Sequence, residues 1–212
     1  MKMNKYIDHT CLRADAEQED IEQLCKEARE FDFASVCVNP SNIERCKKHL
    51  EGTDIAVCTV IGFPLGAMTT EAKVMEAKDA IERGADELDM VVNIGWVKDG
   101  YDNEVIDEIR AVKAVAGERI VKVILETCLL TDREISRACM DAKVAGADFV
   151  KTSTGFSKGG ATVEVVRLIR ETVGDRLKIK ASGGIRTAED AKKMIEAGAD
   201  RIGTSSGPAI CA

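Results

Sequence analysis

The sequence has few of the residues from which metal sites and disulfide frameworks are built. Its only histidines, His9 and His49, do not belong to a cluster with the spacing of metal ligands. Its eight cysteines are scattered singly without a C-x-x-C pair, and Cys25, Cys46 and Cys139 fall in helical patterns that suit small core residues. We therefore expect reduced thiols, no metal and no cofactor.

Long apolar runs and basic tracts are also missing. No stretch approaches the ~18 apolar residues that a membrane span needs, and the opening residues lack the apolar run and the small-residue cleavage site of a signal peptide. The chain has 30 Lys and Arg residues against 37 Asp and Glu, a formal charge of -7, which disfavours nucleic acid and membrane surfaces as partners. These absences predict a cytoplasmic protein with an acidic surface.

The sequence does have a regular alternation of two kinds of segment. Short apolar runs rich in β-branched residues alternate with charged amphipathic segments, a rhythm typical of βα units with a parallel sheet. The expected strands are Tyr6 to Thr10, Phe33 to Asn39, Ile55 to Gly62, Glu87 to Asn93, Val121 to Thr127, Phe149 to Thr154, Lys178 to Ser182 and Arg201 to Ser205. Capping-box patterns that begin at Ser41, Thr131 and Thr187 predict the starts of three helices.

The phrase Gly-Ala-Asp occurs three times, beginning at Gly84, Gly146 and Gly198, each time between a helical pattern and a strand. Glycine there suits the left-handed residue that ends a helix. The spacing of roughly 50 to 60 residues corresponds to about two βα units, which indicates pseudo-repetition within a barrel.

Eight consecutive strands are the number that closes a parallel barrel, and no G-x-G-x-x-G motif opens a helix after the first strand. We therefore predict an α/β fold, a (β/α)8 TIM barrel formed by a single domain over residues 1–212. The final helix is expected to be shortened or missing, because only six residues follow Ser206. An open doubly wound sheet is the structural alternative.

Ionisable residues occur inside strands that otherwise look fully buried: Asp89, Lys122, Lys151 and Lys180. Active sites of such barrels lie at the carboxyl ends of the strands, and strand alternation allows Lys151 and Lys180 to approach each other from neighbouring strands. A desolvated lysine beside a second ammonium has a lowered pKa, which prepares it for Schiff-base attack on a carbonyl, and Asp89 can balance charge and relay a proton. The alternative is that the lysines reach solvent or form structural ion pairs with Asp89 and Glu126.

Glycines and hydroxyls follow three late strands. Gly155, the pair Gly183 and Gly184, and Ser205 lie where barrel enzymes often hold a phosphate, because bare backbone amides there can approach an anion. No Walker-type lysine accompanies them. The pattern therefore favours a small phosphorylated molecule over a nucleotide as the partner.

At these residues the sequence resembles the deoxyribose-phosphate aldolase family, class I aldolases on a (β/α)8 barrel. The resembling blocks extend through nearly the whole chain. They are Ile7-Asp-His-Thr10, Val36-Cys-Val-Asn-Pro40, Gly62-Phe-Pro-Leu-Gly66, Glu87-Leu-Asp-Met-Val-Val-Asn93, Ile124-Leu-Glu-Thr127, Phe149-Val-Lys-Thr-Ser-Thr-Gly155, Lys180-Ala-Ser-Gly-Gly-Ile-Arg186 and Gly203-Thr-Ser-Ser206. The blocks around Lys151 and Lys180 are the most specific.

The resemblance implies that Lys151 forms an imine with acetaldehyde, that Lys180 tunes Lys151, and that Asp89 takes part in proton transfer. The enamine would attack glyceraldehyde 3-phosphate to give 2-deoxy-D-ribose 5-phosphate, and the reverse cleavage would serve deoxynucleoside breakdown. Two alternatives remain: another Schiff-base barrel aldolase or a transaldolase, and a phosphosugar-binding barrel without catalysis.

The resemblance also implies roles for residues around the reacting carbon. It assigns phosphate binding to Gly155, Gly183, Gly184 and Ser205, and it places Cys37, Asp8 and Thr10 near the substrate, although packing or strand-end hydrogen bonds would explain these three equally well. We further expect a homodimer or homotetramer. A missing last helix would expose apolar surface near Tyr6 and Ile202, to be covered by a partner subunit or by the amino-terminal segment.

Overall fold

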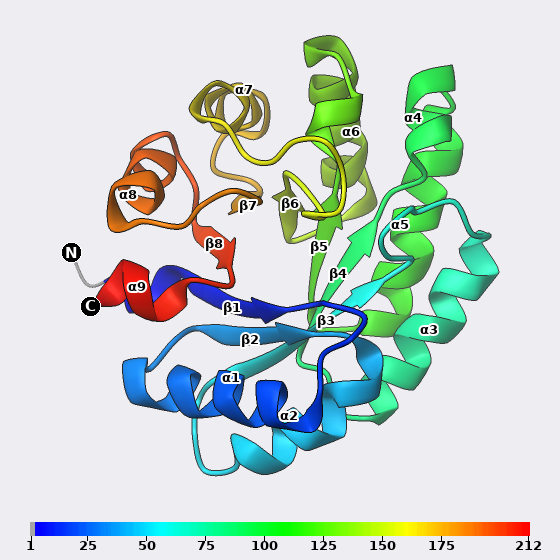
Figure 1. Ribbon diagram of the computed structural model, residues 1–212. Helices are drawn as coiled ribbons and strands as arrows, with labels where there is room; N and C mark the ends of the chain where they lie inside the picture. The colour runs from blue at the N-terminus through cyan, green and yellow to red at the C-terminus, as the bar shows by residue number, and fades with distance from the viewer. Residues whose placement is uncertain (1–2) are drawn as a thin grey trace.

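The computed structural model describes residues 3–212 as a closed parallel barrel whose eight strands follow one another in chain order (Figure 1). The strands are β1 (Ile7–Cys11), β2 (Ser35–Val38), β3 (Ala56–Ile61), β4 (Glu87–Val91), β5 (Ile120–Ile124), β6 (Phe149–Lys151), β7 (Lys178–Ser182) and β8 (Arg201–Thr204). Strand β8 pairs with β1, which closes the sheet. The predicted (β/α)8 barrel is confirmed, and the open doubly wound sheet is excluded.

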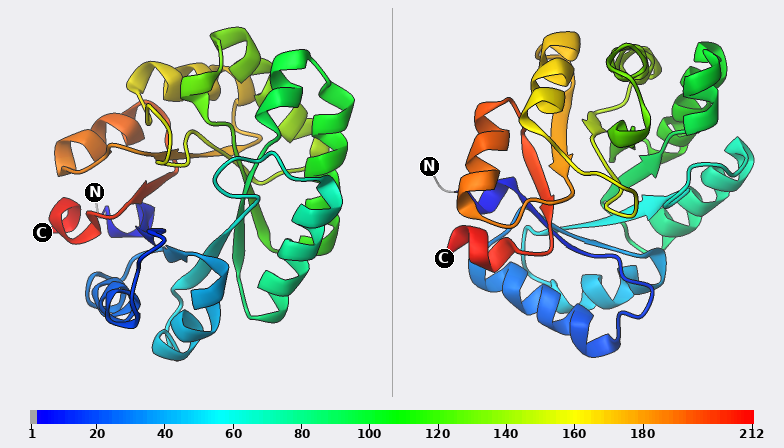
Figure 2. Two further views of the ribbon diagram at one scale, coloured as in Figure 1. Left: turned by 45° about the vertical axis from the view of Figure 1, so that its right-hand side comes forward. Right: turned by 45° about the horizontal axis from the view of Figure 1, so that its top comes forward.

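Helices surround the barrel on its outer side, as the further views in Figure 2 show. They are α1 (Gln18–Phe31), α2 (Ile43–His49), α3 (Thr70–Glu82), α4 (Ile94–Asp99), α5 (Asp102–Ala116), α6 (Asp132–Ala145), α7 (Val163–Val173), α8 (Ala188–Glu196) and α9 (Gly207–Cys211). Three 3-10 turns precede or interrupt them: η1 (Asn4–Tyr6), η2 (Pro40–Asn42) and η3 (Thr127–Leu129). None of the helices in this described part of the chain is long and apolar enough to cross a membrane.

Two of the three predicted helix starts are confirmed. Thr131 and Thr187 each accept a hydrogen bond from the backbone of the first helical turn in a complete capping box. The prediction at Ser41 is wrong, because Pro40 opens the 3-10 turn η2 and helix α2 begins only at Ile43. Proline fixes the backbone angle φ there and displaces the helix start beyond the serine.

The final helix α9 is short, as predicted, with five residues. It contacts α1, α8 and β1, and the turn η1 contacts β8. Ile202 and Ile210 are consequently buried, and Tyr6 is half-buried. The barrel surface near Ile202 is therefore covered by the chain's own residues, including the amino-terminal turn, and needs no partner subunit to exclude water.

The three Gly-Ala-Asp phrases form the same structure at the amino-terminal end of the barrel. Each glycine has a positive φ, as expected for a residue that ends a helix. Each aspartate accepts a hydrogen bond at 2.8 Å from a backbone N–H near the start of the preceding strand. The donors are Val57, Val121 and Ile179 respectively. The same carboxylates pair with Lys47, Lys113 and Arg170. The repeat is thus an anchor that fixes the start of one strand to the loop before the next.

The sequence also produces a buried ion pair outside the barrel, between α3 and α5. Lys73 Nζ lies 2.6 Å from Glu108 Oε1, and both side chains are fully buried. Lys73 also donates to the carbonyl of Val91, and Glu108 accepts from the backbone N–H of Asn93. Because Val91 is the last residue of β4 and Asn93 follows it closely, the pair holds the carboxyl end of that strand in place.

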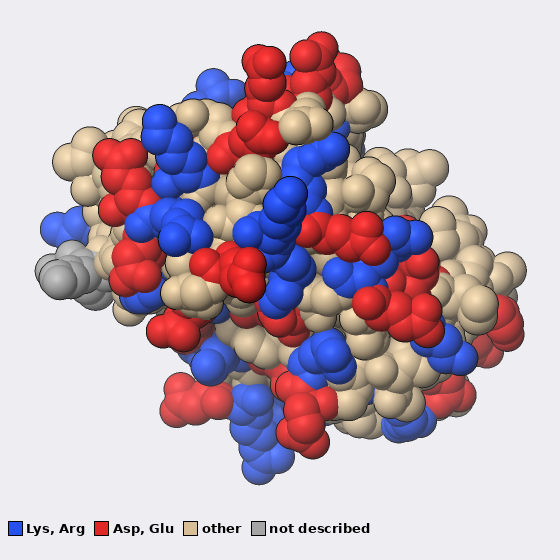
Figure 3. All heavy atoms as spheres, turned by 90° about the horizontal axis from the view of Figure 1, so that it is seen from below, with Lys and Arg blue, Asp and Glu red and all other residues tan. Residues whose placement is uncertain are grey.

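The outer surface carries interleaved charges of both signs. Figure 3 shows one face on which Lys and Arg side chains alternate with Asp and Glu, without a continuous basic area. This arrangement agrees with the formal charge of -7 and gives no electrostatic footprint for a polyanion on that face.

Asp141 on α6 is a buried carboxyl group whose Oδ2 has no hydrogen-bond partner within residues 3–212. Burial raises its pKa to about 6, the nearby Asp102 carboxylate acts in the same direction, and Arg137 opposes them. A carboxyl group whose pKa is higher in the folded than in the unfolded protein destabilises the fold once it ionises.

We therefore predict that Asp141→Asn increases the free energy of unfolding by about 1–2 kcal/mol at pH 7 to 8. Because the pKa of Asp141 is raised in the folded state, its protonated form contributes fully to wild-type stability below the unfolded pKa near 4. This contribution is lost as the pH rises through about 6. The advantage of the variant should shrink as pH falls from 6 to 5. Urea denaturation across this range measures it, with Asp107→Asn on exposed α5 surface as the control. A pH-independent difference would contradict the assignment.

Candidate active site

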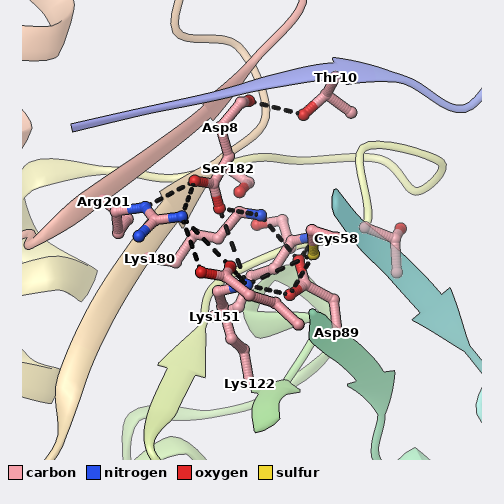
Figure 4. A network of polar contacts seen from close by, with 12 residues as sticks. Asp8, Thr10, Cys58, Asp89, Lys122, Lys151, Lys180, Ser182 and Arg201 are labelled. Carbon is pink, nitrogen blue, oxygen red and sulfur yellow. Dashed lines mark hydrogen bonds and ion pairs between the residues drawn. The ribbon is translucent and has the colours of Figure 1, made fainter. Parts of the chain in front are cut away.

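The interior of the barrel holds a network of charged side chains in place of the branched apolar layers that usually fill such barrels (Figure 4). Alternation along the strands turns these residues inward, while their sequence neighbours pack against the helices. Among the described residues, the network contains the carboxylates Asp8, Glu87 and Asp89 and the cations Lys122, Lys151, Lys180 and Arg201. Four cationic side chains therefore face three carboxylates.

Asp89 on β4 is the centre of this network. Its Oδ2 accepts hydrogen bonds from Lys151 at 2.9 Å and from Lys180 at 2.7 Å, and its Oδ1 accepts from Lys122 at 2.8 Å. Burial alone would raise the pKa of Asp89, but these three ammonium groups outweigh burial and hold its pKa well below the usual range. Asp89 therefore remains a carboxylate at neutral pH.

Lys180 and Lys122 are held as cations. Burial lowers the pKa of each, but the surrounding carboxylates outweigh that effect and raise it. Asp8 and Asp89 lie around Lys180, and Asp89, Glu87 and Asp8 lie around Lys122. Lys180 Nζ lies 2.6 Å from Asp8 and 2.7 Å from Asp89. Its charge is thus fixed by two short ion pairs in a site without water contact.

Lys151 differs from the other two lysines. Asp89 is its one carboxylate partner in the described network, and it lines an open cavity at the carboxyl ends of the strands. The register places Lys151 directly opposite Lys180 on the neighbouring strand, and both amines bond the same carboxylate oxygen. The Nζ atoms of Lys151 and Lys180 therefore lie no farther apart than the sum of these two hydrogen-bond lengths, 2.9 Å and 2.7 Å.

The cavity has a volume of about 380 Å³ and opens above the charged network. Six of the predicted site residues line it: Lys151, Thr10, Gly155, Gly183, Gly184 and Ser205. The other four lie beneath it and are fully buried: Lys180, Asp89, Asp8 and Cys37. The structure thus brings the ten residues together in two layers, a cavity wall and a buried charged layer.

The buried layer gives specific surroundings to two of these residues. Asp8 pairs with Lys180 and Arg201, which outweigh burial and lower its pKa, so it is a counterion in the network. Cys37 lies beside Cys58 and near Asp89, and its pKa is lowered to about 7 chiefly by a hydrogen bond from Cys58. Neither side chain forms part of the cavity wall.

The glycine turns make one end of the cavity suitable for an anion. Gly155, Gly183 and Gly184 all have positive φ, between 82° and 89°, which a side chain would strain. A Cβ atom on Gly183 would also lie 2.9 Å from the Cα of Gly160, so the two loops approach as bare backbone. Arg13 and Arg186 line the same cavity and add positive charge that the sequence interpretation did not include. Arg186 directly follows Gly183-Gly184-Ile185, so the sequence itself indicates that it lies beside the glycine turn.

The alternative in which the strand lysines form ion pairs is confirmed for Asp89 and wrong for Glu126. Lys122, Lys151 and Lys180 all pair with Asp89, and Lys122 also pairs with Glu87. Glu126 is buried with φ of 54°, and its carboxylate accepts hydrogen bonds from the backbone N–H and the hydroxyl of Thr154. It therefore fixes the loop that leads into the turn at Gly155.

Ser182 is a second missed residue. It lines the cavity beside Lys151, and its buried Oγ makes no hydrogen bond to any residue that the structure describes. An unpaired hydroxyl in a cavity wall is suited to bind a polar group of a ligand. Its position two residues after Lys180, on the same strand face, was readable from the alternation.

Comparison with known proteins agrees with this geometry. Residues 2–212 match the model of the DeoC/LacD family aldolases. The chain belongs to this family. A deoxyribose-phosphate aldolase of Streptococcus pneumoniae (strain Taiwan19F-14) is 60% identical over 210 residues, which cover 99% of this chain and 96% of that protein.

Solved structures give the same result. A protein described as QR15, an aldolase, is 43% identical with a TM-score of 0.96, and the match covers 100% of this chain and 95% of that one. The deoxyribose phosphate aldolase from Aeropyrum pernix, described as having a unique tetrameric structure, is 34% identical with a TM-score of 0.90 and covers 99% and 89%. The family resemblance inferred from the sequence motifs is confirmed.

We predict that Lys122→Met lowers the free energy of unfolding by about 3–5 kcal/mol, because it leaves Glu87 and Asp89 buried with one counterion fewer. Urea denaturation at pH 7 measures the change. Lys178→Met is the matched control, since Lys178 lies on a barrel strand but is exposed. Its stability should change by less than about 1 kcal/mol. Equal effects of the two substitutions would show that the charge network contributes nothing special.

Proposed function

We propose that the chain is a class I deoxyribose-phosphate aldolase, which reversibly cleaves 2-deoxy-D-ribose 5-phosphate to acetaldehyde and D-glyceraldehyde 3-phosphate through an imine on Lys151. One observation carries the assignment of the nucleophile. Lys151 is the lysine of the described network that both reaches the cavity and shares its carboxylate oxygen with a second, permanently charged amine. Family membership and 60% identity to a curated aldolase of this name support the reaction.

The charge count supports a nucleophilic amine at this position. The described network has one cation more than it has carboxylates, and a buried excess charge is costly. Lys151 is the amine of this network with a single carboxylate partner, while Lys180 has two and Lys122 has three. Lys180 then has the role of a fixed positive charge beside the amine that attacks the carbonyl.

The reaction follows from this arrangement. The Lys151 amine attacks the aldehyde carbon of the open-chain sugar, and loss of water gives the protonated imine. The C3 hydroxyl loses its proton, the bond between C2 and C3 breaks, and its electron pair forms the enamine with release of the phosphorylated aldehyde. Protonation of the enamine at C2 and hydrolysis then release acetaldehyde. Asp89, held as a carboxylate beside Lys151, relays these protons through water.

The phosphate group would occupy the glycine-rich end of the cavity. Backbone amides at Gly155, Gly183 and Gly184 and the Ser205 segment approach it, with Arg186 adding charge. Thr10 lines the cavity near the carboxyl end of β1, and its hydroxyl donates a hydrogen bond to the carbonyl of Asp8 at 2.8 Å, which orients this part of the wall. Cys37 lies beneath the cavity, close to the reacting amines.

We also propose that the chain forms a single domain and assembles as a homo-oligomer, a dimer or a tetramer, in the cytoplasm. The barrel closes within one continuous set of strands, and the Aeropyrum pernix relative is described as tetrameric. The interleaved surface charges in Figure 3 fit a phosphosugar enzyme without a nucleic acid partner.

Borohydride reduction in the presence of acetaldehyde tests the proposed imine. We expect one ethyl adduct, mapped by peptide mass spectrometry to Lys151, and none in Lys151→Ala. That substitution should also reduce kcat/KM by at least about a thousand-fold, because the nucleophile is removed. Lys178→Ala is the matched control and should retain the adduct. Turnover with dihydroxyacetone in place of acetaldehyde would assign another Schiff-base aldolase, and an unchanged mass would leave only a binding function.

We predict that Glu126→Ala raises KM for 2-deoxyribose 5-phosphate about ten-fold or more, because the Thr154 loop loses a charged hydrogen-bond acceptor. Cleavage of unphosphorylated 2-deoxyribose should change much less, since the loop positions the phosphate. Steady-state kinetics with both sugars separates the two effects, and Glu126→Gln should partly restore the loop. An equal loss with both substrates would indicate general structural damage instead.

A further inference from the structure

The buried thiols on strands β2 and β3 form a cluster that the aldolase mechanism does not use. Cys37 and Cys58 are paired in the strand register, and their side chains point into the barrel. Figure 4 shows Cys58 beside Asp89, with its Sγ 3.1 Å from Asp89 Oδ1. The two sulfur atoms and a carboxylate oxygen of Asp89 all lie within 4.8 Å of one another. Three neighbouring strands thus bring three potential metal ligands to one point.

We propose that Cys37, Cys58 and Asp89 form a site for a thiophilic divalent cation such as Zn²⁺ or Cd²⁺, and that its occupation inhibits the aldolase. Two thiolates and a carboxylate are donors of the type that bind these ions, with bonds of about 2.0–2.3 Å. Tetrahedral coordination at such bond lengths requires ligand separations of about 3.5–3.8 Å. Cys58 Sγ and Asp89 Oδ1 are 3.1 Å apart and no pair of the three ligand atoms is separated by more than 4.8 Å, so side-chain adjustment within the site suffices.

The positive surroundings do not prevent binding. The divalent ion brings two charges, and coordination releases the two thiol protons as the thiolates form. Release of up to two protons therefore offsets charge that the ion brings. Lys122 Nζ, 3.4 Å from Cys58 Sγ, remains as a hydrogen-bond donor to the coordinated sulfur. With three protein ligands, the fourth position is open to water.

Inhibition follows from the use of Asp89 as a ligand, and this part rests on the proposed function. Asp89 holds both Lys151 and Lys180 through its Oδ2. A metal on this carboxylate withdraws negative charge from the two amines and removes the group that relays protons. The bound ion and the imine on Lys151 should therefore exclude each other.

Cadmium titration of the reduced protein tests the site directly, because cadmium thiolates have a charge-transfer absorption in the ultraviolet. We expect one equivalent of Cd²⁺ to bind with this absorption and Cys58→Ala to weaken binding at least ten-fold. Cys46→Ala is the matched control, since Cys46 is a buried thiol on helix α2, outside the barrel interior. It should bind as the wild type does. Equal binding by Cys58→Ala, or no absorption with the wild type, would overturn the site.

Trapping of the acetaldehyde imine by borohydride then tests the inhibition. Cd²⁺ or Zn²⁺ should block the Lys151 adduct in the wild type, leave it intact in Cys58→Ala, and release it again after a chelator is added. Adduct formation by the loaded wild type would refute inhibition. If the metal-free protein forms no adduct, the proposed aldolase function fails, while the cadmium absorption still decides the site. Cys58→Ser, with circular dichroism to check folding, replaces Cys58→Ala if the latter does not fold.

Discussion

The carboxylate of Asp89, held in the centre of the barrel among three ammonium groups, is the interaction on which the rest of the site depends. Without it, Lys122, Lys151 and Lys180 would be buried cations in close proximity, which is strongly unfavourable. With it, two of the lysines are fixed as cations by further carboxylates, and Lys151 is left with a single partner at the floor of a cavity. The same carboxylate thus organises the charges and leaves Lys151 as the amine of the network that reaches the cavity.

The charged network requires the hydrophobic core to lie elsewhere in the fold. Because the barrel interior holds charged side chains, the apolar surface is buried in the layer between the strands and the helices. Strand positions are fixed by polar anchors: the repeated Gly-Ala-Asp carboxylates at one end, and the Lys73–Glu108 pair behind the carboxyl end of β4. The charged network thus lies inside the barrel, while the residues that anchor the strands lie in the loops and helices around it.

The site also links the chemistry of the amines to that of the thiols. Cys58 hydrogen-bonds Asp89, and its in-register neighbour Cys37 lies below the cavity wall. Both thiols are small buried side chains that pack beneath the cavity without lining it. They also give a soft cation a way to compete for the carboxylate that the amines share.

The sequence by itself determined the eight βα units, the Gly-Ala-Asp anchors and the inward position of Lys151 and Lys180, because periodicity and turn chemistry are local properties. Motif resemblance supplied the family. Only the tertiary structure decided which carboxylate each lysine meets: Lys122 pairs with Glu87 and Asp89 rather than Glu126, and Cys37 lies outside the cavity wall. The stagger of the closed sheet sets these contacts, and it depends on all eight strands together, so no single segment encodes it.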